Sequence, residues 1–455
     1  PPRSTLFPYT TLFRSNVNGL IALDAVKFGG GMGNVARRPS AEIIKNQQSA
    51  SDKGSGKVQA NPVTENEFSW KLSGKPRFLE GSRYYLQYAG MPDTLVYSPN
   101  NYKNDYNDDY QSRSLWVNYL IDNPFTEEKD RGAKGLGIPV DLSLAFHTDA
   151  GVTPGDSIIG TLAIYSTATD SAKFPDGTSR MASRDLSDIV QTEITKDIRQ
   201  IYNAKWTRRG IWDRPYYEAR RPDVPAMLLE LLSHQNLADQ KYGLDPAFRF
   251  DVSRSVYKGI LKYLAYTENR DYIVQPLPVK DLALVPLKGK TFRLSWKPSA
   301  DENEPASMPD RYLVYKRTGE SGFDNGTITD KNEFEFEIDS LNTIYSFKVT
   351  AVNDGGESFD SEVLSAGINE KNAGNVLIVN GFDRISGPSW FDNGNMAGIS
   401  WWEDRGVADH YDFINIGDQY DFNRQNSWLD DDSPGWRLEE RRGGKECRSR
   451  VAADC

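Results

Sequence analysis

The chain has 455 residues, in which 54 Lys and Arg face 64 Asp and Glu, giving a formal net charge of −10. This acidic balance excludes a general surface for nucleic acid or anionic membranes, which needs an excess of basic residues. The cysteines, Cys447 and Cys455, lie near the C-terminal end, so neither a disulfide framework nor a cysteine-based zinc site is expected elsewhere. The mean hydropathy is −0.61, and no stretch approaches the run of about 20 apolar residues of a membrane span, so no transmembrane segment is expected.

The two ends of the chain share no pattern with the residues that they flank. Residues 1–16, beginning PPRSTLFPYTTLFRS, and residues 439–455, ending RRGGKECRSRVAADC, resemble translated sequencing-adapter read-through. No fold is therefore predicted for either of these two segments. We therefore expect residues 17–438 to be an internal piece of a longer protein, with targeting signals and further ligands lying outside it.

The first segment inside these ends, residues 17–38, reads as an apolar, strand-like run followed by the sequence GGGMGN. Glycines after a strand are typical of phosphate-binding loops, but this sequence lacks the Lys-Ser/Thr pair of a P-loop and the spacing of a dinucleotide site. The segment resembles the last strand of a golvesin-like β-sandwich module, the accessory domain of proteins labelled xanthan lyases. Residues 39–75 are rich in Gln, Ser, Lys, Asn and Gly and are predicted to be a linker.

Strands alternate with helices through residues 76–268, which predicts a three-layer α/β domain. The strand that ends at His147 is expected to be a buried strand of a parallel sheet, whose C-terminal end delivers polar groups to a crevice. The predicted elements are a helix over 76–90, a short strand over 93–97, a helix through 113–120, strands over 142–147 and 158–165, an amphipathic helix over 183–202, a strand over 225–232 and a closing helix over 248–264.

Short alternating strands separated by turns fill residues 275–368 and predict a β-sandwich. Trp296, Tyr345 and the sequence YSFKVTAVNDGGES resemble a fibronectin type III domain. Residues 372–438 then open with the apolar run NVLIV and continue into an aromatic, acidic stretch, which predicts a further α/β unit truncated at the foreign tail. The chain is therefore expected to be multidomain.

Three side chains in the α/β segment are candidates for chemistry: Glu80 at the start of the first helix, His147 at a strand end and Glu230 inside an apolar strand. A carboxylate in an apolar strand is costly to desolvate unless it is paired, protonated or facing a polar cleft. A zinc hydrolase gives such a carboxylate a role, because the metal polarises a carbonyl while a glutamate transfers the proton. Without any family resemblance, the residues favour a structural interpretation, in which His147 is a hydrogen-bonded core histidine, Glu80 caps a helix and Glu230 pairs with an arginine.

Six segments of the chain favour a catalytic interpretation over the structural one. They are, in chain order, FLEGSRYYLQYAG, DYQSRSLWVNYL, SLAFHTDAG, GTLAIYS, NAKWTRRGI and PAMLLELLSHQN. In this order residues 76–265 resemble the zinc-dependent N-acetylmuramoyl-L-alanine amidase domain. The resemblance implies that Glu80 and His147 bind zinc and that Glu230 is the catalytic acid and base. Arg113 is expected to clamp the acidic loop NDYNDD, and His234 to be a loop residue without a metal role.

The chain departs from this family at the first metal ligand, which is a histidine preceding the ligand glutamate. The three histidines of the chain, His147, His234 and His410, all follow Glu80. In similar envelope proteins of the Bacteroidetes type this ligand lies upstream of the golvesin-like module. We therefore expect the first ligand in the missing part, and an incomplete zinc site in this chain.

The resemblance implies a fragment of a secreted or periplasmic, zinc-dependent peptidoglycan hydrolase that cleaves the amide bond between muramic acid and L-alanine, impaired by the loss of its first histidine ligand. Its partner would be peptidoglycan or another envelope glycan, and no nucleic acid is expected. The alternative is a non-catalytic envelope adhesion or polysaccharide-binding protein, of the kind labelled xanthan lyase-like, that uses the amidase fold as a scaffold. No substrate-binding residue is assigned.

Overall fold

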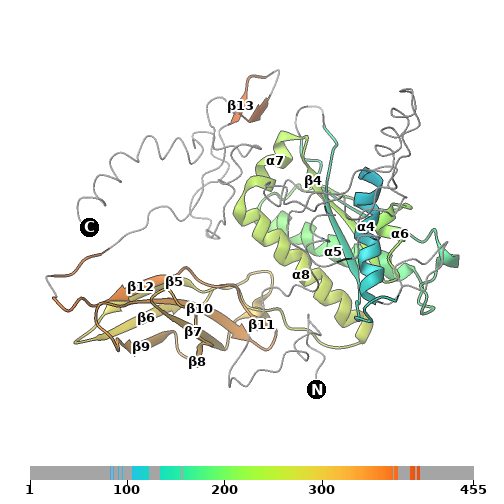
Figure 1. Cartoon of the computed structure of the whole chain (residues 1–455). Coiled ribbons are helices and arrows are strands. Elements are labelled where there is room, and N and C mark those ends of the chain that lie inside the picture. The colour runs from blue at the N-terminus through green and yellow to red at the C-terminus, as the bar shows by residue number, and fades with distance from the viewer. Residues whose placement is uncertain are drawn as a thin grey trace, which may run out of the picture.

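The computed structural model shows two folded units, an α/β domain that ends with helix α8 (Pro246–Glu268) and a β-sandwich that begins with strand β5 (Lys280–Pro286) (Figure 1). None of the described helices is long and apolar enough to cross a membrane. The predictions for residues 17–75 and for most of 372–438 lie outside the described residues. The structure describes Ser82, Leu86, Met91 and Leu95, together with residues 105–121, 134–153, 155, 157–371, 374–377, 390–394 and 397–399.

A four-stranded mixed sheet forms the middle of the α/β domain, in the order β1-β4-β2-β3. β1 is parallel to β4 and β2 is parallel to β3, but β2 and β4 are antiparallel. The His147 strand is thus parallel to its neighbour, as expected, but the sheet as a whole is mixed and not parallel. Between β1 and β2 the described residues of 150–160 form no helix, and so no helical crossover of the kind that joins parallel strands. The strands are β1 (Ser143–Asp149), β2 (Thr161–Tyr165), β3 (Arg208–Asp213) and β4 (Ala226–Ser233).

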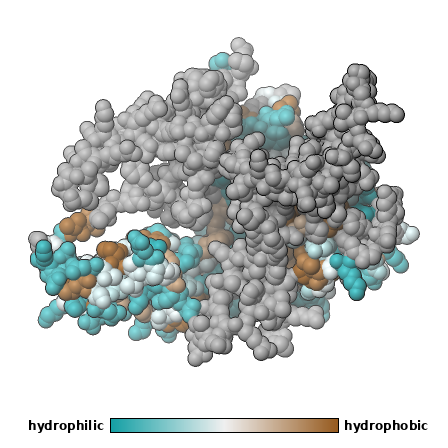
Figure 2. Space-filling view, in the orientation of Figure 1, coloured by the Kyte–Doolittle hydropathy of each residue, from teal (hydrophilic) through white to brown (hydrophobic). Residues whose placement is uncertain are grey.

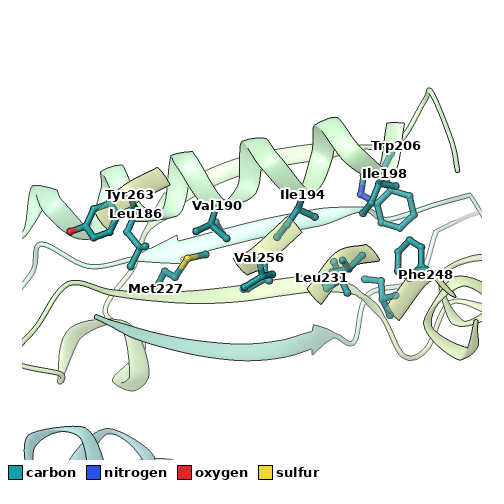
Figure 3. Packing of buried hydrophobic residues seen from close by; sticks show 14 residues of the cluster. Leu186, Val190, Ile194, Ile198, Trp206, Met227, Leu231, Phe248, Val256 and Tyr263 are labelled. Carbon is teal, nitrogen blue, oxygen red and sulfur yellow. The ribbon is translucent and has the colours of Figure 1, made fainter. Parts of the chain in front are cut away.

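Helices cover both faces of this sheet and produce the predicted three layers (Figure 1). α5 (Met181–Ile201) and α8 pack together on one face, and α5 buries the apolar side predicted from its amphipathic pattern. α4 (Asp105–Ile121) and the short α6 (Tyr217–Arg220) lie on the other, and α7 (Leu237–Leu244) connects β4 to α8. Figure 3 shows the main core, in which one side of α5 meets β4 and α8; its labelled members are Leu186, Val190, Ile194, Ile198, Trp206, Met227, Leu231, Phe248, Val256 and Tyr263.

The close approach of α5 to α8 depends on a glycine. A Cβ added to Gly259 of α8 would lie 2.7 Å from the Cα of Val190 in α5, which is closer than packed atoms can approach. Any side chain at this position would therefore separate the two helices.

The polar atom of the buried Trp206 ring has a hydrogen-bond partner, because its Nε1–H donates to Thr161 Oγ1 at 2.9 Å.

Two short apolar runs differ from their predicted structure. Leu95, in the segment predicted as a strand, is helical and buried. Val376 and Leu377, in the run predicted to open another α/β unit, are in coil and are 82% and 86% exposed. The elements described after them are β13 (Trp390–Asp392) and β14 (Ala397–Ile399), an antiparallel pair. Apolar runs this short do not show a periodicity that separates strand from helix or coil.

The β-sandwich has a three-stranded sheet, β5-β6-β9, and a five-stranded sheet centred on β10 and β7. Trp296 and Tyr345 both lie in its core, and Tyr345 Oη accepts a hydrogen bond from the Ser340 backbone N–H at 3.0 Å. This bond resembles the tyrosine corner of immunoglobulin-like sandwiches. The further strands are β6 (Thr291–Lys297), β7 (Arg311–Thr318), β8 (Thr327–Thr329), β9 (Glu333–Glu337), β10 (Ile344–Asn353), β11 (Gly356–Glu357) and β12 (Leu364–Gly367).

Figure 2 shows the visible face of the sandwich as mostly hydrophilic or intermediate, with smaller hydrophobic areas between. Such scattered apolar residues are normal on a solvated surface. The surface of the sandwich that faces α8 differs, because it carries acidic side chains that pair with basic residues of α8.

A row of basic side chains on α8 binds this end of the sandwich. Arg254 Nε lies 2.8 Å from Asp301 Oδ2, and Lys262 Nζ lies 3.0 Å from Glu304 Oε1. Between them, Lys258 is 1% exposed and its Nζ lies 2.7 Å from Asp197 Oδ2 of α5 and 3.6 Å from Glu304 Oε1. The acidic residues of α5, the basic row of α8 and the acidic loop between β6 and β7 thus form one buried ionic junction between the domains.

Removing one partner of a buried ion pair leaves an uncompensated charge, so Lys258→Met should lower the free energy of unfolding by about 3–5 kcal/mol. Lys297→Met is the matched control, because Lys297 and its partner Asp281 are 69% and 54% exposed. The control should change stability by less than about 1 kcal/mol. Denaturant unfolding followed by tryptophan fluorescence measures both, and equal losses for the two variants would contradict a buried junction.

Candidate active site

His147 and Glu230 lie side by side on neighbouring strands. They are register partners in the parallel β1/β4 pair, so their side chains point to the same face of the sheet. Leu228, two residues before Glu230, packs on this face against Ala219 of α6. The alternate residues Leu229 and Leu231 join the core on the opposite face. The two sequence candidates that the structure describes are therefore brought together on the α6 face, and Glu80 lies outside the described residues.

The strand that carries His147 is more open than expected. β1 is at one end of the strand order, and its residues are half-buried or exposed throughout. Phe146 is 54% exposed, whereas seven of the eight residues of β4 are buried. The expectation of a buried strand is therefore wrong for β1 and correct for β4. The reason is that β4 has a paired strand on each side, whereas β1 is paired on one side.

Glu230 is the partly exposed residue in an otherwise buried strand. Its Oε2 atom is buried and has no hydrogen-bond partner among the residues that the structure describes. Burial raises the pKa of this carboxyl, and the nearby charge of Asp149 adds to the effect, while His147, Arg209 and His234 oppose it. The structural interpretation in which Glu230 pairs with an arginine is therefore wrong for the described part of the chain, since no arginine there bonds to it.

His147 is held by a carboxylate that the sequence did not indicate. Its Nε2 lies 2.8 Å from Glu218 Oε2, and the other oxygen of Glu218 lies 3.2 Å from Arg113 Nη1. Arg113 also donates to Asp109 Oδ1 at 2.7 Å and to Ser82 Oγ at 3.1 Å. The segment predicted as an acidic loop is helical from Asp105 on, so the contact with Asp109 is an i,i+4 ion pair within α4 and not the clamp of a loop. Glu218 sits in the four-residue helix α6, 71 residues after His147, and no periodicity in YEAR distinguishes it from a surface glutamate.

A second ion pair borders Glu230 on the other side. Asp149 at the end of β1 pairs with Arg209 of β3, and its Oδ1 accepts from the backbone N–H groups of Ala150 and Gly151 at 2.7 and 3.1 Å. Burial acts to raise the pKa of Asp149, but these hydrogen bonds and the Arg209 charge outweigh it, so the pKa is lowered. Asp149 and Arg209 lie within HTDAG and TRRG, segments that the family resemblance had singled out without assigning them a role.

His234 belongs to the loop after β4, as expected. Its Nδ1 lies 3.0 Å from Thr148 Oγ1, and its backbone N–H donates to the Asp149 carbonyl at 3.0 Å. These bonds tie the loop to the end of β1. The third histidine, His410, lies outside the described residues.

A cavity of about 500 Å³ opens beside His147, between α4 and β1. Arg113 and Trp116 of α4, Phe146 and His147 of β1, and Glu218 of α6 line it. The cavity combines an aromatic wall with the polar His147–Glu218–Arg113 network, as small-molecule and polymer-binding sites often do.

The described residues do not form a complete metal site. No group of three or more His, Cys, Asp or Glu side chains among them is arranged to hold a metal ion. The donor chemistry nevertheless fits zinc, because an imidazole held by a carboxylate is the usual form of a zinc-binding histidine. His147 is the described residue that would bind it, and Glu80 would be a second ligand.

Comparisons with known proteins give two family matches. Residues 115–262 match the N-acetylmuramoyl-L-alanine amidase family, and residues 277–366 match the fibronectin type III domain. No curated protein matches the chain.

Several solved structures are similar to parts of the chain. The CwlD amidase from Clostridioides difficile in complex with the GerS lipoprotein is 17% identical over 38% of this chain and 73% of that chain, with a TM-score of 0.27. The twitchin kinase region from C. elegans is 20% identical over 22% of this chain and only 18% of that chain, with a TM-score of 0.20. The structure of FN3tt mut is 25% identical over 21% of this chain and 98% of that chain, with a TM-score of 0.18.

The two family matches fall in the order that the sequence predicted. An α/β unit with strands and helices alternating is followed by a β-sandwich, so the predicted fold class is confirmed for these two units. The chain carries a domain of the N-acetylmuramoyl-L-alanine amidase family over residues 115–262, followed by a fibronectin type III domain over residues 277–366.

Proposed function

We propose that this chain is part of a secreted, zinc-dependent hydrolase that cleaves the amide bond between N-acetylmuramic acid and L-alanine in peptidoglycan. The observation that carries the proposal is Glu230, whose buried Oε2 has no described hydrogen-bond partner and whose pKa is raised next to His147. An unpaired carboxylate in the middle of a core strand lowers stability, and a role in proton transfer explains why it is there.

His147 and Glu80 would hold the zinc ion, and a third ligand, a histidine, would lie upstream of residue 17. When bound, the zinc ion supplies Lewis-acid polarisation of the amide carbonyl and of the attacking water. Glu230 accepts a proton from the water as its oxygen adds to the carbonyl carbon of the muramoyl group. Glu230 then gives this proton to the alanine nitrogen as the C–N bond breaks, leaving a carboxylate on the muramoyl group and a free amine on the peptide.

The raised pKa of Glu230 suits both proton transfers, from the water and to the alanine nitrogen. A group that takes up a proton and then returns it works best when its pKa lies near the working pH. Burial moves the carboxyl of Glu230 in that direction from its ordinary value. The open β1 edge and the adjacent cavity leave room for a polymeric substrate beside His147.

The second candidate is a non-catalytic envelope protein that binds a polysaccharide or a partner through the same fold. The lack of a three-residue metal-binding group among the described residues favours it. The exposed Phe146 and the neighbouring Trp116 in the cavity would then stack on sugar rings without chemistry. Zinc content and bond cleavage separate the two candidates.

The chain as given should release almost no new alanine amino termini from purified peptidoglycan, because the missing ligand leaves the metal site incomplete. The parent protein, extended upstream to include a histidine ligand, should bind about one zinc per chain and cleave the substrate. In that parent Glu230→Gln should lower kcat by roughly 10²- to 10⁴-fold, with Glu335→Gln on the exposed face of β9 as control.

Each outcome of this assay decides something. Robust turnover by residues 17–438 alone would show that the ligand set is wrong. If the parent protein, extended upstream to include the histidine ligand, binds no zinc and releases no stem peptide, the amidase proposal is rejected in favour of the binding protein.

Glu230→Gln should also stabilise the metal-free protein at neutral pH. The folded-state pKa of Glu230 is raised, so its protonated form favours folding below the unfolded-state pKa, and this stability is lost as the pH rises through the folded-state value. A neutral amide removes the cost of burying the charge, which is on the order of 1 kcal/mol for each unit by which the pKa is raised.

Denaturant unfolding in the presence of a chelator, repeated between acid and neutral pH, measures this gain. The difference between the variant and the wild type should shrink towards the acid end. A variant that is less stable than the wild type at neutral pH would mean that Glu230 makes a favourable ionic contact in the folded protein.

A further inference from the structure

Glu218 is the one carboxylate that touches a candidate metal ligand in the described part of the chain, and neither the sequence nor the family resemblance assigned it a role. It comes from α6, a four-residue helix that follows β3, and it reaches across to the ring of His147. Its side chain is 11% exposed, and that of His147 is 28% exposed. The contact is therefore a sheltered one at the wall of the cavity.

We propose that Glu218 is a positioning residue that fixes the tautomer and the orientation of His147, keeping the proton on Nε2 and leaving Nδ1 as the nitrogen with a free lone pair. This assignment rests on the proposed zinc site only where it concerns the metal. The state of the ring itself is a property of the metal-free chain.

The hydrogen-bond geometry carries the assignment. An ionised carboxylate can only accept hydrogen bonds, so the 2.8 Å contact between Glu218 Oε2 and His147 Nε2 requires a proton on that nitrogen. A neutral imidazole has one N–H and one lone pair, so the lone pair then lies on Nδ1. No described residue is bonded to Nδ1, so its lone pair is available to bind a metal ion.

A cation on the far side of Glu218 holds its carboxylate in place beside the ring. Arg113 contacts its second oxygen at 3.2 Å, and Arg113 is itself fixed by Asp109 and Ser82. The result is a chain of contacts from α4 through α6 to the end of β1.

Two other roles for Glu218 are less consistent with these contacts. As a metal ligand it would need an open lone pair directed at the ion, but its two oxygens already face His147 and Arg113. As a purely structural link between α6 and β1 it would have no reason to select one nitrogen of the ring. Carboxylates that hold zinc-binding histidines by the nitrogen opposite the metal are a common arrangement, and their loss typically weakens metal binding.

The test is nitrogen-15 NMR of histidine-labelled, metal-free chain, in which three histidines give few enough signals to assign with His147→Asn, His234→Asn and His410→Asn. In the wild type, at a pH high enough for the ring to be neutral, His147 should show a protonated Nε2 and an unprotonated Nδ1. In Glu218→Gln, and more strongly in Glu218→Leu, the ring should become a mixture of the two tautomers. Glu335→Gln, which removes an exposed carboxylate paired with Arg293, should leave the His147 signals unchanged.

A second measurement separates this inference from the proposed function. Chelator competition should show zinc affinity falling by roughly 10- to 100-fold in Glu218→Gln in the parent protein with all ligands. A wild-type ring protonated on Nδ1, or tautomers that do not change in either Glu218 variant, would overturn the positioning role. Wild-type tautomers as expected with no zinc binding at all would keep that role and reject the zinc amidase instead.

Thermal unfolding of each variant guards against an indirect effect. A structural role alone would lower the Tm of Glu218→Gln without changing the tautomers of the remaining folded protein. That result, too, would overturn the inference.

Discussion

The parallel pairing of β1 with β4 is the constraint on which the site depends. Because side chains alternate along a strand, one register decides which residues enter the core and which face the α6 side. In β4 this register places Leu229 and Leu231 in the core and Glu230 on the other face. A shift by one residue would bury the carboxylate under α5 and expose the leucines, so the apolar core itself fixes the position of Glu230 beside His147.

The two carboxylates beside His147, Glu218 and Glu230, have pKa values that are shifted in opposite directions. Glu218 has a cation and an imidazole as partners, and its pKa is lowered. Glu230 has a buried oxygen without a described hydrogen-bond partner, and its pKa is raised. Opposite shifts in neighbouring acids are the pattern by which one site obtains a permanently charged group and a group that exchanges protons. Glu218 suits the holding of His147, and Glu230 suits proton transfer.

The fibronectin type III domain occupies a different side of the molecule. It docks on α8, which with α5 covers the sheet face opposite to His147 and Glu230 (Figure 1). The buried contacts of Lys258 join the two domains through charge as well as through the short connection between them. The sandwich therefore contacts the amidase domain at α8, and not at the described residues that line the cavity beside His147.

The sequence by itself determined the two fold classes, the order of the domains and the strands that carry His147 and Glu230, because amphipathic and alternating patterns are local properties of the chain. It also predicted a contact between Arg113 and the acidic residues before it, although these residues are helical and do not form a loop. The direction of β2, the openness of β1 and the partnership of Glu218 with His147 were decided only by the tertiary structure. These features join segments distant in the chain, and a glutamate in a four-residue helix carries no local signal of the ring that it will meet.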